Sequence, residues 1–312
     1  MSEGHIMQEL LAALLRFNLV LGLAVLAVLA LRIPVRRIFG PEVAYGLWAA
    51  PPVAALASVM PARVDDAAPQ VQALTAALAD WSGAALFAWA VGAAVAVAGM
   101  VAAQALFMAK AREGRAGPAV VGVIAPRVLM PAEDGTYTAE ERALIRAHER
   151  EHVARCDPRA GAAAAVLQAL CWFNPLVHLG AHLLRLDQEL ACDAAVLRQR
   201  PRDRALYAKT LLKTQLAAQP LPFGCHWPAS GQHPLEVRVA MLKSAQRYDA
   251  LIGSALIAAA VVGAALAAWH LQPPAPRPGP LVELWERQQR RPVTSVMLVS
   301  LPPRAPAETP GR

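Results

Sequence analysis

The strongest chemical signal in this 312-residue sequence is the pentapeptide His148-Glu149-Arg150-Glu151-His152, which has the pattern HExxH. Residues four apart lie on one face of an α-helix, so both imidazoles can reach one metal ion while Glu149 lies beside them. Zinc accepts nitrogen ligands and keeps one position for water in catalytic sites. Metal binding lowers the pKa of that water, and the glutamate takes its proton as the water attacks a carbonyl carbon. The pattern therefore predicts peptide-bond hydrolysis with Glu149 as the general base.

A catalytic zinc site needs a third protein ligand. A histidine at the short spacing HExxHxxGxxH is absent, because that position holds Pro158. Further along, Glu189 and Asp193 are four residues apart in the stretch 182–200, which contains neither proline nor glycine. We expect Glu189 to complete a site for one Zn²⁺ with the two histidines. Asp193 would accept the second N–H of a ligand imidazole, as the outer partners of metal-bound histidines do.

Two alternatives remain for the metal ligands. His178 and His182 are also four apart and could form a second pair or replace Glu189, but Gly180 between them weakens the helix, so packing roles are favoured. The cysteines contain no CxxC pair, and buried free thiols are the default interpretation. Cys192 is close enough in sequence to Glu189 for oxidation or incidental metal binding to remain a minor alternative.

Local signals define the elements that must position these residues. Thr138 followed three residues later by Glu141 is a capping box, and it predicts a helix over 139–154 that ends before the Asp157-Pro158 pair. The β-branched run 118–130 predicts one or two short strands flanking this helix. A further helix over 202–216 should pack on the same domain with its basic residues, including Lys213, facing water.

The composition is that of a membrane protein, because 56% of the residues are hydrophobic and only 17% are charged. A helix needs roughly 20 apolar residues to cross the hydrocarbon core. Four stretches meet that requirement: 10–31, 43–60, 81–108 and 251–270. Pro51 and Pro52 must kink the second stretch. The first is too long for a removable signal peptide and lacks a small-residue cleavage site.

The basic residues that flank these stretches predict the orientation. They lie on one side of the membrane if the N-terminus is outside: Arg32, Arg36, Arg37, Lys110, Arg112, Arg115, Lys243 and Arg247. We therefore expect a mainly α membrane protein with three transmembrane helices in 1–108, a mostly helical cytoplasmic zinc-peptidase domain in 109–250 and a fourth transmembrane helix at 251–270. The proline-rich tail 271–312 would lie outside the cytoplasmic membrane, although its own arginines argue against that orientation.

Four segments together resemble the BlaR/MecR-type membrane metallopeptidases, which are antibiotic-sensing signal transducers of the gluzincin class. The segments are HEREH at 148–152, RCDP at 155–158, WFNPL at 172–176 and RLDQELACD at 185–193. The resemblance covers roughly residues 1–270. It implies that His148, His152 and Glu189 bind zinc, that Glu149 is the general base and that Asp193 supports a ligand.

The resemblance also implies regulated cleavage of a peptide bond on the cytoplasmic side, either within the chain itself or in a regulator such as a transcriptional repressor. Well-studied members end in a large penicillin-binding sensor domain, and the segment 271–312 is too short to fold into one. Recognition of a β-lactam is therefore not implied.

The other classes of function are a non-catalytic membrane scaffold, a transporter and a nucleic-acid-binding protein. A scaffold that keeps the peptidase fold is the main alternative, although an intact HExxH with a third ligand argues against it. A transporter is disfavoured because the apolar stretches contain almost no ionisable residue to mark an ion path. The net charge of +7 is spread over the membrane flanks and the tail, which favours anionic lipid headgroups over nucleic acid. The expected partners are a protein or peptide substrate and the lipid bilayer.

Overall fold

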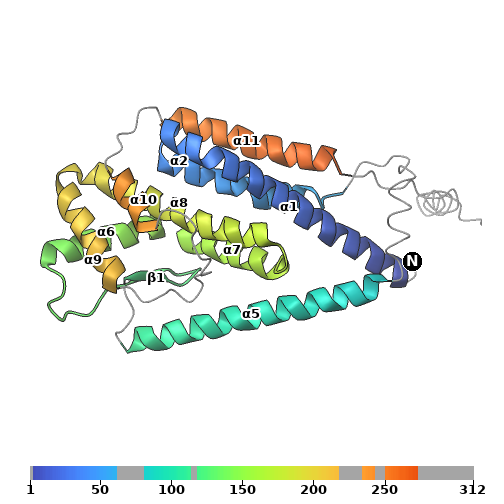
Figure 1. Ribbon diagram of the computed structural model, residues 1–312, viewed down its shortest axis with the longest axis horizontal. Helices are drawn as coiled ribbons and strands as arrows, with labels where there is room; N and C mark the ends of the chain where they lie inside the picture. The colour runs from blue at the N-terminus through green and yellow to red at the C-terminus, as the bar shows by residue number, and fades with distance from the viewer. Residues whose placement is uncertain (1–2, 62–80, 114–117, 218–233, 243–249, 273–312) are drawn as a thin grey trace, which may run out of the picture.

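The structure is a computed structural model that describes residues 3–61, 81–113, 118–217, 234–242 and 250–272 (Figure 1). The described chain is mainly helical, as predicted, with one pair of short strands. The tail beyond Gln272 lies outside the described residues, and so do Arg115, Lys243 and Arg247.

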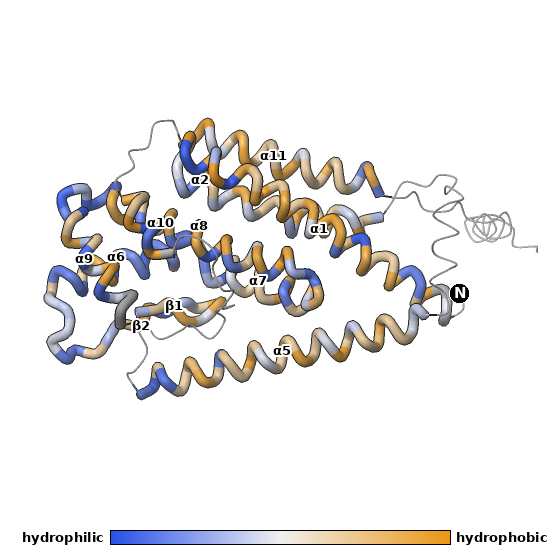
Figure 2. The backbone as a smooth tube through the Cα atoms, viewed as in Figure 1, coloured by the Kyte–Doolittle hydropathy of each residue, from blue (hydrophilic) through white to orange (hydrophobic). Residues whose placement is uncertain are grey.

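Three helices of the described chain are long and apolar enough to cross a membrane: α1 (Glu3–Phe39), α5 (Ser82–Arg112) and α11 (Ala250–His270). They contain three of the four predicted spans. They are largely apolar along their length (Figure 2). Many of their large apolar side chains are exposed, with Leu19 of α1 at 64% and Val95 of α5 at 68%. An apolar surface of this extent marks contact with something other than water, and the length of the helices fits a bilayer.

The second predicted span, 43–60, differs from expectation because it is divided into α2 (Pro41–Gly46), a 3₁₀ turn η1 (Leu47–Ala49) and α3 (Ala50–Ala57). Pro51 and Pro52 have no N–H to donate to the carbonyls four residues earlier. Leu47 O accepts instead from Ala50 N, which closes a tighter turn. The described residues thus include three helices that are both long and apolar enough to cross a membrane, not four, and α3 packs between α1 and α11.

The segment between α5 and α11 begins with the predicted strands. β1 (Ala119–Val121) and β2 (Arg127–Leu129) pair antiparallel with Val120 opposite Val128, and both contact α6. α6 (Ala139–Ala154) has the predicted boundaries, and its capping box forms: Glu141 N donates to Thr138 Oγ1 at 3.2 Å. These predictions are confirmed. Each of them could be made because it depends on contacts within a few residues.

Four further helices follow: α7 (Asp157–Leu170), α8 (Pro175–Gln199), α9 (Arg204–Ala217) and α10 (Pro234–Met241). α8 begins well before the proline- and glycine-free stretch 182–200, because Asn174 caps it and Pro175 occupies its first turn. Lys213 of α9 differs from expectation, since its Nζ lies 2.7 Å from Glu141 Oε2 on α6.

α8 joins two packed regions of the molecule (Figure 1). Its C-terminal half packs with α6, α9 and α10 around a buried cluster that includes Leu144, Val196 and Leu211. Its N-terminal half packs against α1, where Val177 lies in a cluster with Leu21. One rigid helix therefore connects the apolar helices to the part of the molecule that carries the HExxH residues.

Candidate metal centre

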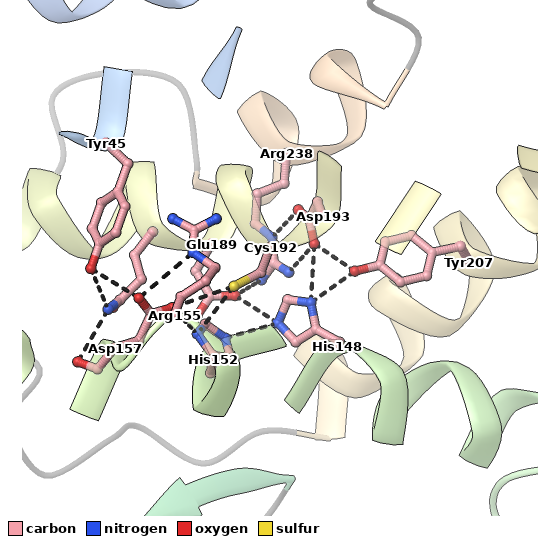
Figure 3. Close-up of polar contacts among 11 residues, drawn as sticks. Tyr45, His148, His152, Arg155, Asp157, Glu189, Cys192, Asp193, Tyr207 and Arg238 are labelled. Atoms are coloured by element: carbon pink, nitrogen blue, oxygen red, sulfur yellow. Dashed lines mark hydrogen bonds and ion pairs between the residues drawn. The ribbon is translucent and has the colours of Figure 1, made fainter. Parts of the chain in front are cut away.

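The HExxH residues lie in the second half of α6, and the side chains of His148 and His152 point toward α8 (Figure 3). The Nε2 atoms of His148 and His152 are 3.1 Å apart. Glu149 is buried beside them, with 6% of its surface exposed. Burial raises the pKa of Glu149, while the two neighbouring imidazoles act to lower it. A carboxylate with a raised pKa is better matched to accepting a proton near neutral pH.

Helix α8 places Glu189 against both histidines. Glu189 Oε2 lies 3.2 Å from His148 Nε2, and Glu189 Oε1 lies 3.5 Å from His152 Nε2. The structure thus brings together the two histidines and the distant glutamate that the sequence analysis selected as zinc ligands.

The orientation of His152 is determined by Asp157, a residue to which the sequence assigned no role at the metal site. Cys156 adopts a left-handed conformation with φ 59°, so that the chain turns sharply and α7 begins at Asp157. Asp157 Oδ2 lies 2.7 Å from His152 Nδ1. A carboxylate only accepts hydrogen bonds, so Nδ1 carries a hydrogen and Nε2, which faces Glu189, is the atom left to bind a metal ion.

The orientation of His148 is determined by Tyr207 of α9, which the sequence analysis missed. The Tyr207 hydroxyl donates to Asp193 Oδ1 at 2.7 Å and lies 2.9 Å from His148 Nδ1, whose hydrogen it therefore accepts. Asp193 Oδ1 itself is 3.5 Å from that nitrogen. The predicted partner Asp193 is thus beside His148, and the tyrosine hydroxyl connects the two. No motif identifies Tyr207; only its place in the helix predicted over 202–216 could have drawn attention to it.

Arg238 of α10 was also missed, and it holds both acidic residues of α8. Its guanidinium bonds to both oxygens of Asp193 at 2.8 Å, and its Nη1 lies 2.9 Å from Glu189 Oε2. Arg238 is 5% exposed. A planar guanidinium can bind one carboxylate with two parallel bonds and still reach another, so Arg238 sets the distance between the two carboxylates.

The electrostatics of the cluster favour a positive charge between the histidines. Burial acts to lower the pKa of His152, but the charge of Glu189 and the hydrogen bond to Asp157 raise it to about 9. Burial likewise acts to raise the pKa of Glu189, and Arg238 and the two imidazoles hold it well below its usual range. The carboxylate is therefore ionised, and the surroundings stabilise a cation at the Nε2 atoms.

The three side chains fit a zinc ion in number, chemistry and spacing. The Nε2 atoms of both histidines and the Glu189 oxygens face one another, and these potential ligand atoms lie within 4.8 Å of one another. A tetrahedral zinc site with bonds of about 2.0–2.1 Å has ligand–ligand distances of about 3.3–3.4 Å. The observed separations of 3.1, 3.2 and 3.5 Å are close to that value.

The other side chains considered as metal ligands are less suited to bind zinc. Cys192 Sγ lies 3.4 Å from Asp157 Oδ2 and 3.3 Å from His152 Nδ1, but burial raises the pKa of the Cys192 thiol, and metal binding requires the thiolate. His178 and His182 belong to neither of the two potential metal groups found among the described residues. The expectation that Gly180 weakens this helix is wrong: Gly180 is inside α8, where a Cβ would lie 3.3 Å from Val25.

Hydrogen bonds connect the candidate metal ligands His148, His152 and Glu189, called the metal cluster below, to the apolar part of the chain. Tyr45 of α2 donates to Asp157 Oδ1 at 2.9 Å. Asp187 of α8 is buried and receives two hydrogen bonds of 2.8 Å from the Arg32 guanidinium and one of 2.8 Å from Trp48 Nε1. The helices that carry Glu189 and support His152 are therefore both attached to the apolar part of the chain.

Comparisons with known proteins agree with the resemblance seen in the sequence. The profile of the BlaR1 peptidase M56 family matches residues 12–85 and 113–242. The regulatory protein BlaR1 of Bacillus licheniformis is 29% identical over 156 residues, which cover 48% of this chain and 26% of that protein. The chain thus aligns with only about a quarter of the length of this relative. No solved structure matches the chain. Because the profile spans both the apolar helices and the metal cluster, the chain belongs to the BlaR1 peptidase M56 family.

Proposed function

We propose that the protein is a membrane-embedded zinc endopeptidase that cleaves a protein at the cytoplasmic face of the membrane. The observation that carries the proposal is the convergence of three donor atoms, from His148, His152 and Glu189, beside the buried carboxylate of Glu149. Membership of a peptidase family supports the reaction class.

The residues of the chain divide the work of hydrolysis between them. Zinc held by the two histidines and Glu189 would supply a Lewis acid that lowers the pKa of a water and polarises the substrate carbonyl. Glu149 takes the proton from the attacking water and delivers it to the amine that leaves. Asp157 and Tyr207 keep the Nδ1 hydrogens of the imidazoles in place, so that both Nε2 atoms stay available. Arg238 holds Glu189 in position.

The arrangement of the helices supports the predicted topology of four crossings. α1 and α5 both run toward the end of the molecule that carries α6, α9 and α10, and α11 runs away from it, while the N-terminus is at the far end (Figure 1). The segments α2, η1 and α3 follow one another without a gap from 41 to 57 and would provide the second crossing. Arg36, Arg37, Lys110 and Arg112 lie at the peptidase ends of α1 and α5, as expected for a cytoplasmic side.

The substrate we propose is a protein, either a regulator such as a transcriptional repressor or the chain itself. A signalling role is supported by the regulatory name of the Bacillus licheniformis relative. The strand pair β1–β2 packs on α6, and no third strand of the described residues pairs with it. An extended peptide can add to such an edge by backbone hydrogen bonds.

The proposal is tested with three membrane preparations: the wild type, Glu149→Gln and the control Glu151→Gln. Glu151 is in the same helix, and its side chain bonds to Gln199 instead of the metal cluster. We expect one zinc per chain in all three proteins, and new peptide termini in mass spectra from the wild type and the control only. Zinc-free, folded wild type would refute the proposal. Identical termini in all three would support the alternative of a non-catalytic scaffold.

A further inference from the structure

The hairpin formed by α7 and α8 is unusually apolar for a part of a cytoplasmic domain. Residues 160–184 contain no Asp, Glu, Lys or Arg. The segment includes most of α7, the turn 171–174 and the first half of α8. It therefore has the composition of a membrane segment, although neither α7 nor α8 is among the described helices that are both long and apolar enough to cross a membrane.

The first half of α8 runs alongside the apolar stretch of α1. At one end, Asn174 Nδ2 donates to Asn18 O at 3.3 Å, and at the other Arg32 pairs with Asp187. Between them, Gly22 of α1 and Gly180 of α8 allow close contact with the opposite helix. Asn18 and Arg32 are about 21 Å apart along a helix, which is most of the roughly 30 Å of a hydrocarbon core. The hairpin thus lies at the same depth as this stretch of α1.

The turn of the hairpin reaches the interior of the second long helix, α5. Trp172 Nε1 donates to Trp89 O at 3.2 Å, and Trp89 Nε1 donates to Leu170 O at 2.8 Å. A Cβ at Gly92 would lie 2.2 Å from the Trp172 ring, so the indole packs directly on the α5 backbone. Gly92 is about 15 Å from the start of α5, which again places the turn well inside a span.

Two backbone carbonyls at the turn accept hydrogen bonds from side chains. Where water is absent, a backbone carbonyl outside a helix needs such a donor from the protein. Leu170 O accepts from Trp89, and Trp172 O lies 2.8 Å from His178 Nε2. The other nitrogen of that imidazole lies 3.2 Å from Gln168 Nε2. In water such donors would be unnecessary, since solvent would satisfy the carbonyls. The hydrogen bonding of the turn therefore supports an apolar environment and gives His178 a structural role.

The outer surface of the hairpin exposes large apolar side chains: Val166 at 57%, Phe173 at 45%, Trp172 at 39% and Leu170 at 37%. Like the exposed apolar side chains of α1 and α5, these side chains need an apolar partner other than water. We infer that the α7–α8 hairpin enters the hydrocarbon core from the side of the metal cluster and that lipid acyl chains cover its exposed face. The segment 160–184 is then a re-entrant membrane element within the predicted cytoplasmic domain.

The test measures what surrounds a nitroxide spin label on the hairpin in reconstituted vesicles of phosphatidylcholine and phosphatidylglycerol. Labels are attached to Phe173→Cys on the hairpin, to Val95→Cys on α5 as the lipid reference and to Arg150→Cys on α6 as the water reference, all with Cys156→Ser and Cys225→Ser. Molecular oxygen concentrates in hydrocarbon, whereas a neutral nickel chelate stays in water. We expect the label at position 173 to resemble that at 95, with oxygen collisions exceeding nickel collisions several-fold.

Two results would overturn the inference. A nickel-rich pattern like that at position 150 would place the hairpin in water. Protection from both reagents would mean that protein, such as a second copy of the chain, covers this face. Val166→Cys provides an independent label on α7 if Phe173→Cys does not fold, and a single thermal transition identifies the folded variants. None of these readouts depends on peptidase activity, so the inference can fail while the proposed function stands.

Discussion

The hydroxyl of Tyr45 donates a hydrogen bond of 2.9 Å to Asp157, whose other carboxylate oxygen lies 2.7 Å from His152 Nδ1 (Figure 3). One carboxylate therefore connects α2, in the segment between two membrane helices, to an imidazole of the metal cluster. A movement of α2 relative to α6 would change the support of that imidazole. This relationship offers a physical route by which the membrane part of the chain could influence the peptidase site.

The first prediction concerns this connection. We expect Asp157→Asn to weaken zinc binding by about 10–100-fold, as removal of such outer partners does, and Tyr45→Phe to weaken it by less than about tenfold, because the tyrosine acts only through the aspartate. Competition with a chelator of known affinity measures both. Tyr137→Phe is the control, since the Tyr137 ring contacts Lys213, away from the cluster. Equal affinities for Tyr45→Phe and wild type would show that the connection does not support the metal.

The second prediction concerns the buried ion pair between α1 and α8. Asp187 is 1% exposed and binds the Arg32 guanidinium by two hydrogen bonds. Removing one partner of a buried pair leaves an uncompensated charge and costs about 3–5 kcal/mol. In detergent, we expect Asp187→Asn to lower the free energy of unfolding by about that amount. The double variant Arg32→Met/Asp187→Asn should lower it by less, because it leaves no unpaired buried charge. If the two single variants and the double variant showed additive losses in denaturant unfolding, the pair would not be coupled.

The third prediction separates the charge of Arg238 from its shape. Arg238→Lys keeps the positive charge, but an ammonium cannot make two parallel bonds to Asp193 and also reach Glu189. We expect a lower melting temperature and at least about tenfold lower zinc affinity than in the wild type, since the position of Glu189 is lost. Arg202→Lys, at an exposed site before α9, is the matched control. If Arg238→Lys bound zinc as tightly as the wild type, the positive charge at position 238 would be sufficient to hold Glu189 in place.

The fourth prediction concerns removal of the metal. His148 and His152 belong to α6 and Glu189 to α8, so a bound ion links two helices of the folded chain that the unfolded chain does not hold together. A ligand at 100 times its dissociation constant stabilises the folded state by about 2.7 kcal/mol. We expect a strong chelator to lower the melting temperature of the wild type by several degrees and to leave that of His148→Ala nearly unchanged. An equal decrease in both would show that the chelator acts elsewhere.

The fifth prediction concerns acid stability at α6. The hydrogen bonds from Lys213 and from Thr138 N hold the pKa of Glu141 below its usual range. The unfolded chain therefore takes up this proton at a higher pH than the folded chain does. The resulting stabilisation is present above about pH 4.5 and is lost as the pH falls through the lower folded value. With chelator present, the melting-temperature difference between wild type and Glu141→Gln should be smaller at pH 4 than at pH 7. A difference that stays constant would show that the interaction between Lys213 and Glu141 does not stabilise the folded chain.

The features that could be predicted are those whose causes lie within a few residues of the chain. The start of α6 depends on Thr138 and Glu141, which bond to each other across one turn, and its end depends on the Asp157-Pro158 pair. The HExxH spacing places two imidazoles on one face of any helix that contains it. Hydropathy over 20 residues is likewise a property of one continuous stretch, so α1, α5 and α11 could be recognised.

The misjudged features depend on contacts that the local pattern does not contain. Gly180 is tolerated within α8 because Val25 and Trp48 occupy the space next to it. The break at Leu47–Ala49 replaces a simple kink because two consecutive prolines remove two donors from the same turn. Lys213 bonds to Glu141, although its own helix presents it as one of several basic residues.

The sequence by itself determined the candidate ligand types, the helix that presents two of them and the apolar stretches around them, because helix geometry and hydropathy act locally. Only the tertiary structure decided which groups support those ligands: Asp157 for His152, Tyr207 for His148 and Arg238 for Glu189. Each of these contacts joins two different helices. Many aspartates, tyrosines and arginines have equivalent local patterns, and it is the packing of α7, α9 and α10 around α6 and α8 that selects among them.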